Sequence, residues 1–267
     1  GADDWESRAL PPARQGEAAM SLTLDPHAMG WLIRKLESIT PLSDLDRRAI
    51  ESLSVSIRRF EPRQDIVRDQ DRPSQCCLVL QGWVHRYKLL DEGRRQIVSF
   101  HVPGDMPDLQ SLHLRVMDHS VATLTACTLA FIPHEHVRDL LLRFPSLSEA
   151  MWRDTLIDAA IFREWLTGVG RRSSHARIAH LFCEMYVKLE AVGLAKDHRC
   201  SWPLTQGDLA DALGLSNVHV NRVLQDLRGQ GLITLRGGML TFEDWPALSR
   251  LAEFDPTYLH LDRREAA

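Results

Sequence analysis

The chain has 267 residues, of which 44% are hydrophobic, 25% charged and 7% aromatic. These proportions are typical of globular proteins and exclude a collagen, a wholly disordered chain and a disulfide scaffold. No apolar run approaches the ~18 residues of a membrane span, and residues 1–20 lack the apolar stretch of a secretory signal. We therefore expect a cytoplasmic protein without a membrane partner.

The net charge of −4 is unevenly distributed. Residues 171–240 carry nine Lys/Arg and six Asp/Glu, a net charge of +3, so the remainder carries −7. A cationic module on an acidic body favours binding to nucleic acid.

The N-terminal half predicts two helices and then many short strands. Residues 1–20 are predicted to be a flexible tail, and helical spacing follows at 25–36 and 41–53. From 54 to 133, short β-branched and apolar runs alternate with turn signals at intervals of ~8–12 residues. This pattern is typical of an antiparallel sandwich or barrel.

Helical spacing returns at 134–144 and at 146–169. The second helix carries an apolar stripe too wide for one lone helix, made of Met151, Trp152, Thr155, Leu156, Ala159, Phe162, Trp165 and Leu166. The β-structure of the same chain could cover all of it, but its position between two modules favours a dimer seam. Gly168 and Gly170 are expected to end the helix and supply a hinge.

Residues 205–242 carry the functional prediction. Thr205 is expected to cap a helix with Asp208 at capping-box spacing, Gly214 to form a tight turn, and Ser216 to cap a second helix. Two helices so joined form a helix-turn-helix, and the Gly237-Gly238 pair predicts a hairpin wing after it.

The exposed side of the second helix has the side chains that read DNA. Arg and Asn grip guanine and adenine edges in the major groove, and an apolar side chain contacts the thymine methyl. We expect base reading by Asn217, Val218, Asn221 and Arg222, and phosphate contacts by Thr205, Gln206, Ser216 and His219. The alternative is a solvated polar helix face.

The sequence resembles the Crp/Fnr family of bacterial transcription regulators over roughly residues 25–250. The helix-turn-helix and wing carry the resemblance, together with three β-roll segments: LQGWVHRY at 80–87, DEGRRQI at 91–97 and FHVPGD at 100–105. The resemblance implies an α+β fold: an antiparallel β-roll (double-stranded β-helix) sensor at 21–145, a dimerisation helix at 146–169 and a winged helix-turn-helix at 170–250, followed by a C-terminal tail at 251–267. It also implies a homodimer that binds a near-palindromic site in double-stranded DNA and works with RNA polymerase.

The sequence departs from the effector sites of that family. Pro107 and Asp108 stand where cyclic-nucleotide-binding members have Gly-Glu, and residues 114–121 lack the Arg-Ser pair that neutralises the cyclic phosphate; Arg115 could substitute only if its loop folds back. A buried phosphate without a cation is costly, so cAMP is not expected. Residues 1–50 contain no Cys, which excludes the iron–sulfur cluster of oxygen-sensing members.

Other effector chemistry finds little support. Four scattered histidines could ligate haem, namely His85, His101, His113 and His119. Scattered histidines are more often surface or core residues, so no cofactor or metal is predicted. Cys183 could be a redox thiol close to the DNA, although a buried inert thiol is the simpler interpretation. In the reading helix, Val218 replaces a Glu common in the family, whereas Arg222 matches its base-reading Arg.

Two other classes of function are weighed. One is a small-molecule sensing module, for cyclic nucleotide or haem, in which DNA binding is secondary. The other is an enzyme, for which Asp105, Asp108 and His101 are the only catalytic-looking cluster. These three residues coincide with a structural corner of the β-roll, so no enzymatic activity is predicted.

Overall fold

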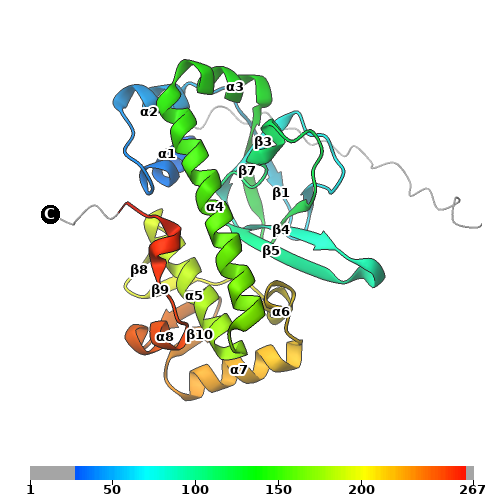
Figure 1. Cartoon of the computed structure of the whole chain (residues 1–267), viewed down its shortest axis with the longest axis vertical. Coiled ribbons are helices and arrows are strands. Elements are labelled where there is room, and N and C mark those ends of the chain that lie inside the picture. Colours follow the sequence, from blue (N-terminus) through cyan, green and yellow to red (C-terminus); the bar gives the residue numbers. More distant parts are fainter. Residues whose placement is uncertain (1–27, 263–267) are drawn as a thin grey trace, which may run out of the picture.

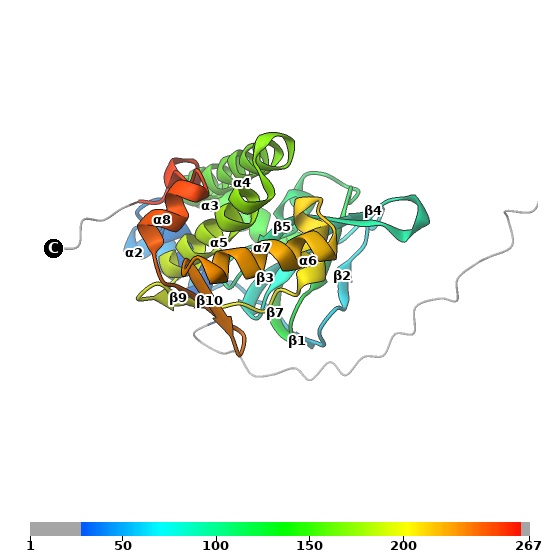
Figure 2. The same ribbon diagram turned by 90° about the horizontal axis from the view of Figure 1, so that it is seen from below.

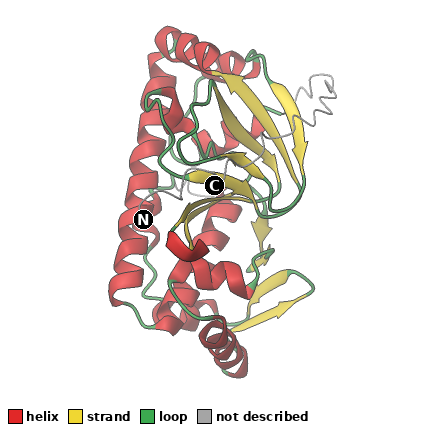
Figure 3. Ribbon diagram, turned by 90° about the vertical axis from the view of Figure 1, so that its right-hand side faces the viewer, coloured by secondary structure: helices red, strands yellow, loops and turns green. Residues whose placement is uncertain are grey.

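A computed structural model describes residues 28–262 and consists of two lobes joined along one long helix (Figure 1). The tail predicted at 1–20 and the start of the helix predicted at 25–36 lie outside these residues. The N-terminal lobe comprises residues 28–144 and the C-terminal lobe residues 174–251. Helix α4 (Pro145–Arg171) connects the two lobes in the chain. It runs along one side of the molecule, and the strands lie on the other side (Figure 3).

The N-terminal lobe is the predicted β-roll. One sheet has the order β1-β7-β3, with strands β1 (Ser56–Phe60), β7 (Cys127–Pro133) and β3 (Gln75–Gln81). The other has the order β2-β6-β4-β5, with strands β2 (Asp65–Val67), β6 (Ser120–Thr123), β4 (Val84–Leu89) and β5 (Arg95–His101). All pairings are antiparallel, and the expected fold class is confirmed.

A close backbone approach explains the glycine of the LQGWVHRY segment. Gly82 has φ +89°, and a Cβ at this position would lie 2.5 Å from the carbonyl oxygen of Ala126. No L side chain fits so close a contact, so this turn between β3 and β4 depends on glycine.

Three helices frame the roll. Helix α1 (Gly30–Glu37) precedes α2 (Asp44–Glu51), whose N-terminus carries a capping box between Ser43 and Asp46. Helix α3 (His134–Arg143) follows β7, and a single residue, Phe144, separates it from Pro145, which starts α4. Proline is favoured at the first position of a helix because its missing N–H has no intrahelical acceptor there.

The expected hinge at Gly168 and Gly170 was wrong. Both glycines lie inside α4, which continues to Arg171, and the backbone N–H of Arg172 bonds the carbonyl of Gly168. The chain turns instead at Arg172–Ser173, where the Ser173 side chain caps α5 (Ser174–Ala191).

The C-terminal lobe is a winged helix-turn-helix. Helices α6 (Gln206–Leu213) and α7 (Asn217–Gly229) pack on α5, and α8 (Trp245–Leu251) follows the wing. The sheet has the order β10-β11-β9-β8, with members β8 (Ala195–Lys196), β9 (Arg199–Ser201), β10 (Ile233–Arg236) and β11 (Met239–Phe242). Strands β8 and β9 were not predicted, because two or three residues are too few to show a period of two.

The expected C-terminal tail at 251–267 was wrong for its described part. Leu251 ends α8, and the chain then returns to the N-terminal lobe through the short 3₁₀ helix η3 (Pro256–Leu259). Leu259 is 2% exposed and belongs to the same buried cluster as Leu36 and Ile157. Burying Leu259 and the ring of Tyr258 favours a packed segment over a solvated one.

Candidate nucleic-acid interface and sensory chamber

The turn between α6 and α7 has the geometry expected from the sequence. Thr205 accepts a bond from the backbone N–H of Asp208, whose carboxylate accepts from the backbone N–H and hydroxyl of Thr205 in return. Gly214 has φ +64°, a left-handed conformation that favours glycine, and Ser216 caps α7 through the N–H of His219. These local bonds fix where each helix begins and how steeply the two cross.

Helix α7 lies across the lower end of the molecule, with its N-terminal end beside α6 (Figures 1 and 2). Its inner side is fully packed through Val220, Val223 and Leu224. Among the predicted base-reading residues, Asn217, Val218 and Arg222 are exposed, with Val218 at 82%, whereas Asn221 is half-buried.

The predicted phosphate contacts surround the two helix N-termini. Thr205 and Ser216 are exposed cap residues and Gln206 is half-buried. His219 is also half-buried, and its Nε2 lies 2.7 Å from the hydroxyl of Ser174 on α5. That contact holds the imidazole at the junction between α5 and α7.

An ionic contact between the lobes was missed by the sequence analysis. The guanidinium of Arg95 on β5 lies 3.1 Å from the Asp208 carboxylate and 2.8 Å from that of Asp211, both on α6. Arg63 approaches Asp208 at 3.5 Å, and the Gln96 amide donates to the carbonyl of Ala212. Asp208 is buried; hydrogen bonds from Thr205, and the nearby Arg63 and Arg95, outweigh its burial and lower the pKa of this carboxyl. Nothing in the local sequence connects Arg95 with a residue more than 100 positions away.

The apolar stripe of α4 divides into two faces. Trp152, Leu156, Phe162 and Leu166 are exposed by 37–74%, Thr155 is exposed and Ala159 half-buried. Val169, 42% exposed, extends this face by one further turn. This outward row is here called the α4 stripe.

Two residues predicted for the dimer seam face the interior instead. Met151 is buried at 5% exposure in the core shared with α1. Trp165 donates its Nε1–H to Glu184 at 3.0 Å and packs on Phe100, with ring centroids 5.8 Å apart. A spacing of three and four residues marks an apolar helix face but cannot separate two adjacent faces that pack on different partners.

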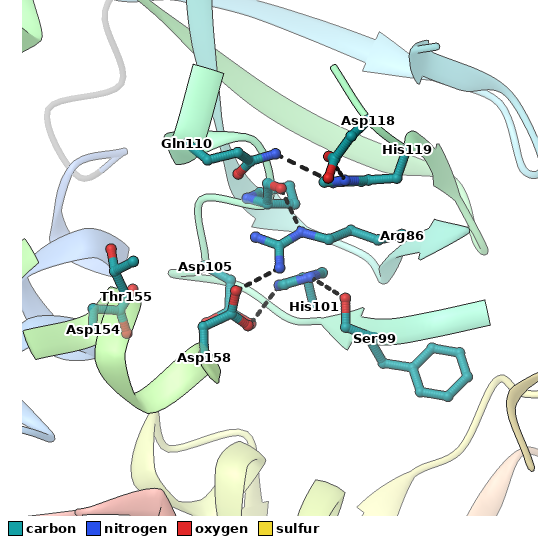
Figure 4. Close-up of polar contacts among 12 residues, drawn as sticks. Arg86, Ser99, His101, Asp105, Gln110, Asp118, His119, Asp154, Thr155 and Asp158 are labelled. Atoms are coloured by element: carbon teal, nitrogen blue, oxygen red, sulfur yellow. Dashed lines mark hydrogen bonds and ion pairs between the residues drawn. The ribbon is translucent and has the colours of Figure 1, made fainter. Parts of the chain in front are cut away.

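The chamber between the β-roll and α4 is occupied by the protein's own side chains (Figure 4). Arg86 of β4 points toward α4; its Nε donates to the carbonyl of Pro107, and its Nη1 lies 2.5 Å from the Asp158 carboxylate of α4. The remaining cavity is about 70 Å³, well below the ~300 Å³ of a typical small-molecule pocket. Arg115, the only substitute cation considered from the sequence, is exposed and does not line this cavity.

The cluster of His101, Asp105 and Asp108 lies at the corner of the β-roll that follows β5. Asp105 lies 3.1 Å from the Lys35 ammonium and 3.5 Å from His101 Nδ1, and it accepts from the backbone N–H of Val102. Asp108 accepts from the backbone N–H of Cys77 at 2.8 Å. These bonds hold the corner together, which fits a structural role for all three residues.

Burial dominates the protonation of this region. It lowers the pKa of His101 to about 4, with Arg86 as a further cause, and raises the pKa of Asp108 to about 6. Burial and the neighbouring Arg95 lower the pKa of His85 to about 4 as well. Both imidazoles are therefore neutral at pH 7.

The four haem candidates do not converge. His101 contacts Ser99 and Asp105, His85 contacts Arg95, His119 contacts Asp118 and Gln110, and His113 is exposed. Across residues 28–262, no three His, Cys, Asp or Glu side chains are arranged to hold a metal ion.

Cys183 is fully buried in α5, and burial raises the pKa of its thiol to about 12. A thiol that is neither ionised nor accessible reacts slowly with oxidants. This environment favours the inert, structural interpretation over the redox one.

The comparisons agree with this architecture. Residues 176–251 match the Crp-like helix-turn-helix domain, and residues 57–144 match the cyclic nucleotide-binding domain. The nitrogen fixation regulation protein FixK of Rhizobium meliloti (strain 1021) is 30% identical over 67% of this chain and 79% of its own. The fumarate and nitrate reduction regulatory protein of Escherichia coli (strain K12) is 22% identical over 78% of this chain and 84% of its own. The solved structure of FixK2 from Bradyrhizobium japonicum shares the fold with a TM-score of 0.68 and 22% identity, covering 74% of this chain and 98% of that one.

A β-roll joined through a long helix to a winged helix-turn-helix defines a DNA-binding transcriptional regulator. The chain belongs to the Crp/Fnr family of such regulators. Within its described residues, no helix combines the length and apolarity needed to cross a membrane.

Proposed function

We propose that this regulator binds a near-palindromic DNA site as a homodimer, with one α7 helix of each subunit in the major groove. In this proposal Asn217, Val218, Asn221 and Arg222 read base edges, and Thr205, Gln206, Ser216 and His219 contact phosphates. The observation that carries the proposal is the protruding start of α7, whose exposed side bears Asn and Arg while its other side is fully packed.

The α4 stripe supports the homodimer. An exposed apolar row of this length along one helix is the feature that a second copy of the helix covers in a coiled-coil-like seam. We assign sensing to the β-roll, dimerisation to α4 and DNA reading to the C-terminal lobe. RNA polymerase is the proposed further partner, and the cytoplasm, where the DNA is, the proposed site of action.

We propose further that neither cAMP nor haem is the signal. The Arg86–Asp158 pair fills the place between the β-roll and α4, and a ligand would have to displace that pair from a cavity of about 70 Å³. The same observation argues against a small-molecule sensor, with DNA binding secondary, whose ligand lies in this chamber.

Selection of bound DNA from a random library by the purified full chain tests the reading proposal. We expect an inverted repeat with half-sites about one helical turn (~34 Å) apart. Arg222→Ala should cost about 1–3 kcal/mol and relax one base position in each half-site. The matched control is Arg228→Ala at the exposed far end of α7, which should weaken binding uniformly or not at all. An unchanged preference in Arg222→Ala would contradict the assigned role.

The dimer is tested by replacing stripe residues with glutamate and measuring the mass in solution. Leu156→Glu and Phe162→Glu should yield monomers, because a buried unpaired charge in an apolar seam is strongly unfavourable. Leu142→Glu is the control: Leu142 is 82% exposed and lies on α3, off the stripe. A wild-type protein that is monomeric at micromolar concentration would refute the seam.

A further inference from the structure

The chain does not end with the winged helix-turn-helix. The match to that domain stops at residue 251, yet residues 252–262 run from α8 back along α4 to the N-terminal lobe (Figure 1, red). We call residues 252–262 the C-terminal strap. In Figure 1 it lies to the left of α4, whereas α6, which Arg95 contacts, lies to the right.

The first anchor of the strap is a buried polar network. The Tyr258 hydroxyl donates to Glu184 at 2.7 Å and lies 3.0 Å from His180 Nε2, and the two rings are stacked at 5.8 Å. His180 Nδ1 lies 3.2 Å from the carbonyl of Ala252, and the same Glu184 carboxylate accepts from Trp165 of α4. One carboxylate of α5 therefore ties the strap and α4 together.

The second anchor reaches the N-terminal lobe itself. Leu259 is 2% exposed in the cluster that contains Leu36 of α1 and Ile157 and Ile161 of α4. Three residues further on, the backbone N–H of Asp262 donates to the carbonyl of Ser38 at 2.7 Å. The strap thus bonds a segment more than 200 positions earlier in the chain.

These anchors change the mechanics of the molecule. Without them one covalent connection, at Arg172–Ser173, joins the C-terminal lobe to α4. The lobe also meets the β-roll through a shared apolar cluster, in which Trp83 packs on Trp202 at 6.0 Å, and through the ion pairs of Arg95 and Lys188. The strap is a second place of attachment, against α1 and α4, and a lobe held at two separated places loses rotational freedom that one place leaves. The strap adds a second chain crossing with its own buried apolar side chain.

We propose that the C-terminal strap fixes the orientation of the C-terminal lobe on α4 and thereby sets the separation of the two α7 helices in the dimer. The inference rests on the proposed function. Tyr258 and Leu259 are its positioning residues: they do not touch DNA but determine which half-site spacing the dimer accepts. An inverted repeat is bound tightly when both reading helices already match its spacing, because no ordering cost remains.

The test uses the full-length protein and the inverted repeat that it selects. The variants are Tyr258→Phe, Leu259→Ala and their combination, and each is measured on the native repeat, on repeats with one base pair added or removed, and on a single half-site. The combined variant should bind the native repeat about tenfold more weakly, which is the loss expected when preorganisation of two linked sites is removed. Its affinity for the half-site should stay within about twofold, and its discrimination against altered spacing should shrink.

His260→Asn is the matched control. His260 is an exposed strap residue at φ +46°, a conformation that Asn tolerates, and it should behave as the wild type. Unfolding curves and the mass in solution establish that each variant is a folded dimer. If Leu259→Ala does not fold, Tyr258→Phe, which keeps the stacked ring and loses only the hydroxyl, should still show reduced spacing discrimination.

Unchanged spacing discrimination in folded variants would overturn the proposal. So would an equal loss of affinity for the half-site and the repeat, because that outcome places the effect within the reading lobe. Failure of the proposed function is recognised separately, as a wild-type protein that selects no inverted repeat.

Discussion

Asp158→Ala removes one partner of the Arg86–Asp158 ion pair, which fills the chamber between the β-roll and α4. The Arg86 side chain is 7% exposed and Asp158 31% exposed. Removing one partner of a fully buried pair costs about 3–5 kcal/mol, because the remaining charge is left without compensation. Arg86 keeps its bond to the Pro107 carbonyl, and water reaches the Asp158 side, so we expect the free energy of unfolding to fall by about 2–3 kcal/mol.

A double-mutant cycle isolates the pair. Arg86→Leu combined with Asp158→Ala should destabilise by less than the sum of the single changes, with a coupling of about 1–3 kcal/mol. The assay is urea unfolding at one fixed protein concentration, since dimer dissociation makes the midpoint depend on concentration. Asp139→Ala is the control, because its pair with Arg143 is about two-thirds exposed on both sides and should contribute less than about 1 kcal/mol. Additive single changes would refute the interpretation that Arg86 is held by Asp158.

Three further predictions concern stability and the contact between the lobes. Gly214→Ala should lower the free energy of unfolding by about 1–2 kcal/mol in urea unfolding, since φ is +64°, and Gly214→Asn by less; an equal effect of both would contradict the backbone argument. Between pH 6.5 and 4, His85 and His101 are protonated in the unfolded chain but stay neutral in the folded one, because their folded pKa values are about 4. Asp108 has the opposite effect: its folded pKa of about 6 means that the folded chain binds this proton before the unfolded one does. These three groups together should reduce stability by about 1.4 kcal/mol per pH unit on acidification; Asp108→Asn should steepen the fall, and a shallower slope would show the sign to be wrong. Arg95→Ala should speed amide hydrogen exchange in α6, because Asp208 loses its nearest cation. The control is Arg94→Ala, at an exposed position, which should leave the exchange unchanged. Equal exchange rates in the two variants would show that the Arg95 contact does not stabilise α6.

Features decided by neighbours along the chain were predictable from the sequence. The capping box of Thr205 and Asp208, the left-handed turn at Gly214 and the wing hairpin at Gly237-Gly238 all depend on bonds within a few residues. The strands of the β-roll were predictable because short apolar runs separated by turn residues are typical of antiparallel strands.

Features whose deciding partner lies far along the chain were not predictable from the sequence. Met151 and Trp165 have the same spacing as Leu156 and Phe162, and only packing shows that the first two face their own core. The C-terminal strap was predicted to be a tail because a short segment with one buried leucine has no periodicity.

The amino-acid order by itself determined the type of protein and its helix-turn-helix, because capping, turn formation and helix periodicity are local properties. Tertiary structure alone decided what fills the chamber between the β-roll and α4 and how the two lobes are held. The contacts of Arg86 with Asp158, Arg95 with Asp208, and Tyr258 with Glu184 join residues 72, 113 and 74 positions apart. Charges on distant segments acquire partners only when the whole chain has folded, so their roles become readable only in three dimensions.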